Sequence, residues 1–155
     1  MIKKLGSIIL FSVLVLLYSC SSSNNVKNPD LKKGDYSYVI SDSSGMSLVE
    51  GVIKIDAVKK DEVTVNYRVS GTYTISKMTE DTTYHGFSTM RAGDYEGFYN
   101  DSLKLLNINT NPKIADANVF INAKVNGNEM KGSWSFSTFR SGLKEAGLFS
   151  ASKVK

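Results

Sequence analysis

Few side chains in this sequence are of a type that does chemistry. The chain of 155 residues contains 1 His and 1 Cys. A catalytic triad could therefore use only His85 as its base, and Asp81 is the nearby carboxylate that could orient the imidazole ring. The sequence has neither a nucleophilic-serine motif nor a phosphate-binding loop. We interpret His85 as an ordinary loop histidine.

Pairs of carboxylates are the other candidates for catalysis. Glu80 and Asp81 are adjacent, and Asp94 and Glu96 would share one face of a strand. Two carboxyl groups about 5–9 Å apart can hydrolyse glycosides. With Asp101, the last pair could also offer oxygen ligands to calcium, but their spacing does not match an EF-hand loop. We interpret all of them as solvated surface charges and expect no catalytic residue, no metal site and no cofactor.

Cys20 is the one residue with a specific chemical setting. It follows two lysines near the start and an apolar run over residues 8–17. That run is shorter than the ~20 residues needed to span a bilayer and is typical of a secretory signal peptide. The segment Leu17-Tyr18-Ser19-Cys20 resembles the lipobox of bacterial lipoproteins. The resemblance implies that residues 1–19 are removed and that the Cys20 thiol carries a diacylglycerol group.

The residues after Cys20 bear on the location of the anchor. Ser21 follows it, and by resemblance to Gram-negative lipoproteins the absence of Asp there implies the outer membrane. The flank also lacks the acidic cluster associated with surface export in some lipoproteins, which favours an orientation toward the periplasm. An ordinary secretory peptide with an incidental cysteine is the alternative. A single cysteine cannot form an internal disulfide, which favours the lipid interpretation. Residues 20–33 begin with the lipidated Cys20 and have almost no apolar content after it. We expect this segment to be a flexible tether.

From Gly34 to the end, apolar and polar residues alternate with period two. This pattern is typical of half-buried β-strands. A two-residue hairpin loop is expected at Asn126-Gly127, and a turn at Asn100-Asp101. Residues 62–77 read as one long strand that points Val63 and Val65 inward and bends at Gly71. The candidate strands are residues 36–40, 53–57, 62–77, 95–99, 103–108, 118–125, 129–136 and 148–154.

These strands predict an all-β domain over residues 34–155. We expect a single antiparallel up-and-down barrel of about eight strands, because the connections are short and meander-like. A two-sheet β-sandwich is the alternative. The net charge of +4 comes from lysines scattered singly along the chain, which does not favour nucleic-acid binding.

The C-terminal residues carry a second resemblance. Gly132-Ser133-Trp134-Ser135-Phe136, then Gly142 and the segment Gly147-Leu148-Phe149-Ser150-Ala151-Ser152-Lys153-Val154 resemble the closing hairpin of small bacterial lipocalin-like lipoproteins. The resemblance implies a calycin-type barrel and the binding of a small, often apolar molecule.

Aromatic side chains are the candidate ligand contacts. Five of them are expected to point into the barrel, where they would either line a pocket with a few polar atoms or fill the core. They are Tyr36, Tyr38, Tyr67, Tyr73 and Trp134.

The expected function is a non-enzymatic, lipid-anchored envelope protein that binds a small apolar or amphiphilic molecule in its barrel. The alternative is a protein–protein interaction module, such as an envelope assembly factor or an inhibitor of a lysozyme-type hydrolase.

Overall fold

In the strands of this fold, side chains point alternately into the barrel and out to solvent, beginning with the first strand. In the computed structural model, residues 28–79, 90–138 and 142–155 are described, with the side chains of residues 143–145 excepted. The strands are β1 (Gly34–Ser41), β2 (Ser47–Lys60), β3 (Tyr67–Met78), β4 (Gly93–Asn100), β5 (Leu105–Asn109), β6 (Asn118–Asn126), β7 (Glu129–Thr138) and β8 (Gly142–Lys153).

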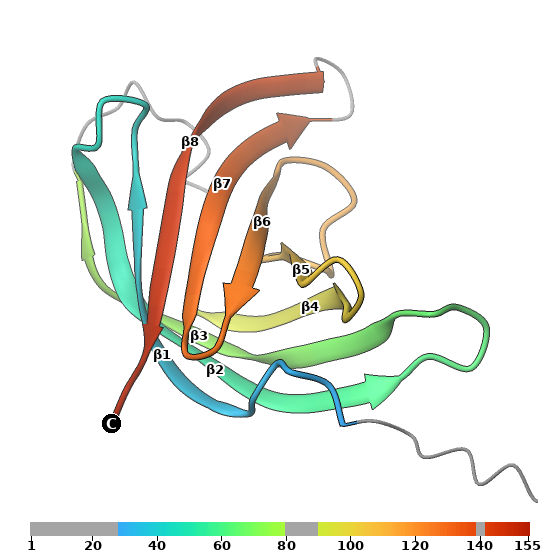
Figure 1. Ribbon diagram of the computed structural model, residues 1–155. Coiled ribbons are helices and arrows are strands. Elements are labelled where there is room, and N and C mark those ends of the chain that lie inside the picture. Colours follow the sequence, from blue (N-terminus) through green and yellow to red (C-terminus); the bar gives the residue numbers. More distant parts are fainter. Residues whose placement is uncertain (1–27, 80–89, 139–141) are drawn as a thin grey trace, which may run out of the picture.

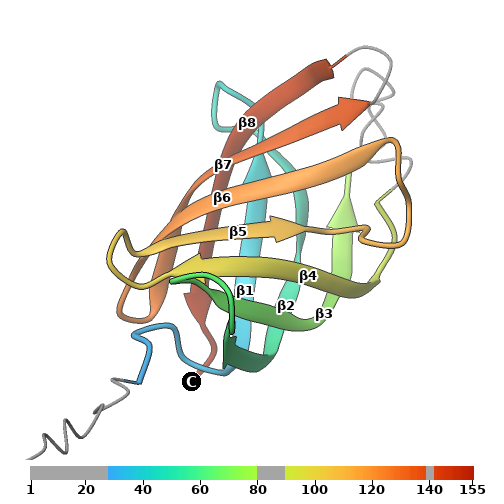
Figure 2. The same ribbon diagram turned by 90° about the vertical axis from the view of Figure 1, so that its right-hand side faces the viewer.

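Within the described ranges, the eight strands form one closed barrel in which each strand pairs antiparallel with the next, and β8 pairs with β1 (Figures 1 and 2). The predicted up-and-down barrel is therefore confirmed, and the sandwich alternative is wrong. The described residues include no helix, so none that is long and apolar enough to cross a bilayer.

The barrel has two ends, and we name them by the chain segments that lie there. The proximal end carries residues 28–33, the loops 61–66, 101–104 and 127–128, and residues 154–155. The distal end carries the loops 42–46 and 110–117. Figure 2 shows the first described residues and the C-terminus together at the proximal end.

A short N-terminal segment covers the proximal end. Leu31 is buried there in the barrel core, and the Tyr36 hydroxyl donates a hydrogen bond of 2.9 Å to the Lys32 carbonyl. Lys104 pairs with Asp30, and the Lys153 ammonium donates to the Lys33 carbonyl at 2.8 Å. The last residues expected to form a flexible tether therefore lie against the barrel.

The segment before β3 differs from its prediction. Val63 and Val65 do not point inward; their exposed fractions are 91% and 75%. The Asp61 carboxylate accepts hydrogen bonds from the backbone N–H groups of Val63 and Thr64, at 3.1 and 2.8 Å. A carboxylate that holds the next backbone donors makes a local turn, which competes with pairing in a sheet. Residues 62–66 therefore form a loop.

Two turns also sit later than their predictions. The β6–β7 loop is Gly127-Asn128 rather than Asn126-Gly127, since Asn126 pairs with Glu129. Gly127 has φ of +60°, a conformation that glycine adopts without strain. The β4–β5 turn extends from residue 101 to 104 rather than ending at Asp101, and the strand after it begins at Leu105.

Candidate functional site

The five aromatic residues predicted to face inward are all buried in the barrel interior. Their exposed fractions lie between 0% and 9%, so the predicted orientation is confirmed. They belong to one hydrophobic cluster that includes residues from all eight strands. Whether any of them binds a ligand stays a prediction.

Three of the interior aromatic residues share one structural role. Each lies directly opposite a glycine on the neighbouring strand and reaches across it to a backbone carbonyl on the strand beyond. The pairs are Tyr38 with Gly51, Tyr95 with Gly71, and Trp134 with Gly147. The acceptors are the carbonyls of Thr74 at 3.2 Å, Lys54 at 3.2 Å and Ser41 at 2.7 Å, respectively.

This arrangement explains why glycine is needed opposite the aromatic ring. A Cβ on Gly71 would lie 1.9 Å from the Lys54 carbonyl oxygen, and one on Gly147 would lie 2.5 Å from the Trp134 Nε1 atom. Glycines that allow sharp bends, covered by aromatic rings, are a known way to curve a sheet into a barrel. Tyr38, Tyr95 and Trp134 therefore use their polar atoms to hold the barrel together.

Burial raises the pKa of the hydroxyls of Tyr38 and Tyr95, which favours the protonated form that donates these hydrogen bonds. The hydroxyl of Tyr73, by contrast, is buried without a hydrogen-bond partner of ordinary geometry among the described residues, although Thr110 lies beside it. Tyr36 uses its hydroxyl on the Lys32 carbonyl. Three of the five predicted ligand contacts, Tyr36, Tyr38 and Trp134, thus donate hydrogen bonds to backbone carbonyls of the protein itself.

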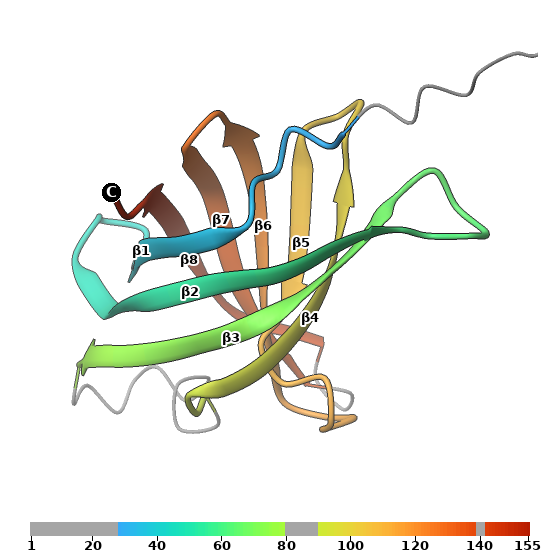
Figure 3. The same ribbon diagram turned by 90° about the horizontal axis from the view of Figure 1, so that it is seen from below.

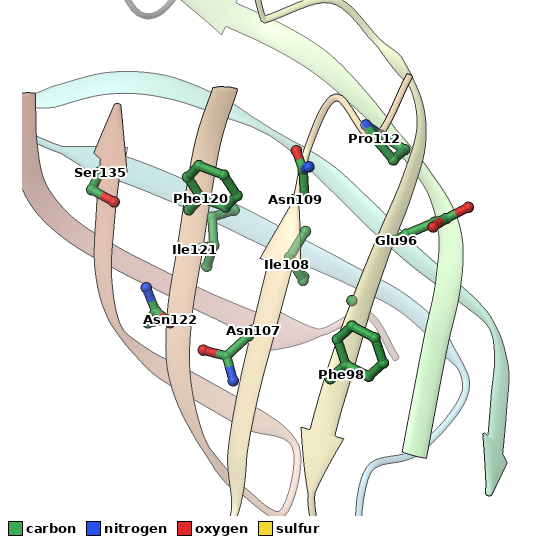
Figure 4. A pocket seen from close by; sticks show the side chains of 11 residues that line it. Glu96, Phe98, Asn107, Ile108, Asn109, Pro112, Phe120, Ile121, Asn122 and Ser135 are labelled. Atoms are coloured by element: carbon green, nitrogen blue, oxygen red, sulfur yellow. The ribbon is translucent and has the colours of Figure 1, made fainter. Parts of the chain in front are cut away.

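A hollow lies instead on the outer wall, across β4 to β7. Its volume is about 530 Å³, which is within the range of small-molecule sites. Figure 4 shows the rings of Phe98 and Phe120 on either side of β5, with Asn107 and Asn109 between them. We call this hollow the outer groove; it is lined by Glu96, Gly97, Phe98, Asn107, Ile108, Asn109, Pro112, Phe120, Ile121, Asn122 and Ser135.

Strand register brings the groove residues together. Glu96 pairs with Asn109, which pairs with Phe120, which pairs with Ser135. A second row two residues along contains Phe98, Asn107 and Asn122, also directly paired. Because residues on the same face of paired strands lie about 5 Å apart, the two rows form one continuous surface. The large rings of Phe98 and Phe120 flank the shorter side chains of Asn107 and Asn109 on β5, and the hollow lies over these asparagines.

The groove offers amide groups that are free to bind. Among the described residues, the side-chain amides of Asn107 and Asn122 have no hydrogen-bond partner, and both belong to strand faces turned to solvent. The side chain of Asn109 accepts a bond of 2.9 Å from the Asn111 N–H, which fixes the start of the loop that contains Pro112. A primary amide both donates and accepts hydrogen bonds, so it can recognise hydroxyl or amide groups without charge.

Glu96 is the acidic member of the groove and lies at its edge. Two smaller hollows on the outer wall, of about 320 and 250 Å³, also include Glu96. Arg68 lies over the Phe98 ring, with 6.0 Å between the guanidinium carbon and the ring centre. Lys113 is paired with Asp94 at 3.3 Å, so its charge is partly neutralised beside the groove. Apart from Glu96, the residues that line the groove are uncharged, and its two aromatic rings are those of Phe98 and Phe120.

The other predicted residues fall into two sets. Asp94 and Glu96 share the outward face of β4, as expected. Among the residues that the structure describes, no group of three or more His, Cys, Asp or Glu side chains is placed to hold a metal ion. Cys20, Glu80, Asp81 and His85 lie outside the described residues.

Sequence reasoning missed the outer groove, although one signal for it was present. Phe120 interrupts the alternation of its strand, because it is an aromatic residue at a position that faces solvent. Phe98 is likewise an outward aromatic residue, with 47% of its side chain exposed. Their proximity depends on the pairing of β4, β5 and β6.

Comparison of the chain with protein-family models, with curated proteins and with solved structures finds no match.

Proposed function

We propose that this protein is a non-enzymatic binding protein, anchored by lipid on Cys20 to the outer membrane and facing the periplasm. Its ligand is a small molecule that is amphiphilic in having both an apolar face and hydroxyl groups, and its binding site is the outer groove. The observation that carries the site is the placement of the Phe98 and Phe120 rings in one groove with the unpaired side-chain amides of Asn107 and Asn122. The lipobox segment that ends at Cys20 carries the anchor.

The chemistry of the groove favours a neutral saccharide as the ligand. The C–H bonds on one face of a sugar ring carry slight positive charge and are attracted to the negative face of an aromatic ring. Sugar hydroxyls both donate and accept hydrogen bonds, which matches the amides of Asn107 and Asn122. A fatty acid would leave these amides without partners, which costs binding free energy.

The structure of the interior supports placing the ligand outside the barrel. The inward aromatic residues Tyr36, Tyr38 and Trp134 already donate to backbone carbonyls. A ligand that displaced any of them would break its hydrogen bond to a backbone carbonyl, which costs binding free energy. The outer groove needs no such rearrangement.

The binding test uses nuclear magnetic resonance on the full chain with a trimer of N-acetylglucosamine and with maltotriose as probes. We expect shifts in the backbone amide signals of Phe98, Asn107 and Phe120. Phe98→Ala and Phe120→Ala should each weaken binding by about tenfold, since an aromatic contact of this kind contributes about 1.4 kcal/mol. The control is Leu148→Ala, which removes an exposed side chain from β8, outside the groove.

The result that contradicts the groove is equally specific. If neither saccharide moves the groove signals, while a detergent such as octyl glucoside moves those of Tyr38 and Tyr73, the ligand lies in the barrel interior.

The lipid anchor has its own test. Cys20→Ala should abolish incorporation of labelled palmitate, and incorporation that persists in this variant would refute the lipid anchor.

A further inference from the structure

The proximal end of the barrel carries the most exposed apolar side chains that the structure describes. Val63 and Val65 are 91% and 75% exposed in the loop between β2 and β3. Leu103 in the β4–β5 turn is 58% exposed, and Val154 near the C-terminus is 50% exposed. Figure 3 shows the β2–β3 loop projecting beyond the barrel on the side where the first described residues leave it.

The β2–β3 loop is held in place although its valines have nothing to pack against. Asp61 is buried at the base of the loop, where its carboxylate accepts a bond of 2.5 Å from Arg68 Nε as well as the two backbone bonds described above. The Lys60 ammonium donates to the Val65 carbonyl at 2.8 Å. The two valines are therefore presented to solvent by a built turn, and their exposure is a feature of the folded state.

The same end of the barrel also carries exposed lysines. Lys32, Lys33 and Lys59 are exposed at the proximal end and make no ion pair among the described residues. Among the acids at this end, Asp61 pairs with Arg68, and Asp30 and Asp101 share Lys104. Asp35 and Glu62 are exposed, so some negative charge stays beside the lysines. Apolar side chains next to unpaired lysines match the interface of an anionic bilayer, where acyl chains meet negative headgroups.

The length of the chain before the barrel sets which surface is within reach. Cys20 precedes Asp30 by ten residues, which span at most roughly 35 Å when fully extended. Asp30 is fixed to the proximal end by a hydrogen bond of 3.0 Å from its N–H to the Asp101 carboxylate. An acylated Cys20 therefore keeps the proximal end, rather than the distal one, close to the bilayer.

We propose that the proximal end docks onto the membrane surface, with Val63 and Val65 inserted at the level of the headgroups and Lys32, Lys33 and Lys59 against anionic lipids. This inference rests on the proposed lipid anchor at Cys20. Docking orients the barrel, because one end is held against the bilayer and the outer groove on β4 to β7 then stands at the side, open to the aqueous compartment.

The test uses the full chain, acylated in a bacterial host and reconstituted into vesicles of phosphatidylethanolamine and phosphatidylglycerol. The chain has 1 Cys, and the lipid consumes its thiol, so an introduced cysteine is the single site for an environment-sensitive dye. Val63→Cys places the dye at the proposed contact. Ile114→Cys, at an exposed position of the distal end, is the matched control.

We expect the dye at position 63 to shift its emission to the blue in vesicles and to be quenched by spin-labelled lipids, with neither effect at position 114. Flotation of the same samples with the vesicles measures the anchor separately. If the protein floats and both dyes report water, docking is refuted while the anchor stands. If the acylated preparation does not float, the anchor and the docking inference that rests on it are both refuted.

Discussion

At the scale of single residues, Asp61 shows how one side chain decides the conformation of a loop. Its carboxylate holds the N–H groups of two following residues and the guanidinium of Arg68. The hydrogen bond from Arg68, and then those from Thr64 and Val63, hold the pKa of Asp61 well below its ordinary value. A carboxyl whose pKa is lowered by folding stabilises the folded state only while it is ionised.

Asp61→Asn should therefore destabilise the protein in a pH-dependent way. At neutral pH we expect a lower melting temperature than in the wild type. The difference should shrink as pH falls below the ordinary pKa of 3.8. Below that pH the Asp61 carboxyl group takes up a proton when the wild type unfolds, and this proton uptake favours the unfolded state. Thermal unfolding followed by circular dichroism from pH 7 to pH 2.5 checks this. Asp56→Asn, which removes an exposed carboxylate paired with Lys54, should have little effect.

At the scale of strands, the glycines opposite aromatic rings determine where the sheet bends. The register of β2 against β3 shifts between Ile55 and Ala57, next to the position where Gly71 faces Tyr95. A bulge of this kind increases the local twist, and close to it the Tyr95 hydroxyl donates a hydrogen bond to the Lys54 carbonyl. The bulge of β2 therefore lies beside Gly71, the residue at which the sequence predicted a bend.

Gly71→Ala should cost about 1–3 kcal/mol of unfolding free energy or more, because the new Cβ meets backbone that has no room to move aside. Gly93→Ala at the start of β4 is the control, since its nearest neighbour would be 3.9 Å away and the substitution should be close to neutral. Urea denaturation of both variants measures the difference. Equal stability of the two variants would show that the close approach at Gly71 does not constrain the fold.

At the scale of the whole molecule, closure of the barrel depends on pairing between the first and last strands. Residues Tyr36 to Ser41 of β1 pair with residues Leu148 to Lys153 of β8. Closure removes the free edges that an open sheet would expose, and free edges promote aggregation. It also seals the interior, where the aromatic residues pack.

A disulfide across this seam tests closure directly. Ser37 and Ser152 lie opposite each other on the outer face, so Ser37→Cys with Ser152→Cys should form a disulfide under mild oxidation in a Cys20→Ala background. Ser37→Cys with Ser133→Cys should not, because β8 lies between β1 and β7. Mass spectrometry of the oxidised proteins distinguishes the two. Failure of the first pair to cross-link would contradict a closed barrel.

The sequence alone predicted the fold class, the number of strands and the residues that face inward. It could do so because alternation is a local property: the pleat of a strand sends successive side chains to opposite faces whatever lies next to it. Val63 and Val65 were misassigned for the same reason. They continue the alternation of β3, and only the hydrogen bonds of the Asp61 carboxylate with Val63 and Thr64 remove them from the sheet.

The outer groove and the role of the interior aromatic residues were decided by tertiary structure. Trp134 and the Ser41 carbonyl are 93 residues apart in the chain and meet only because β8 closes against β1. Phe98 and Phe120 come from different strands, and their placement in one groove depends on the register of β5 between them. Period two tells which face a side chain takes, whereas its neighbours on that face follow from cross-strand register, which pairs residues distant in sequence.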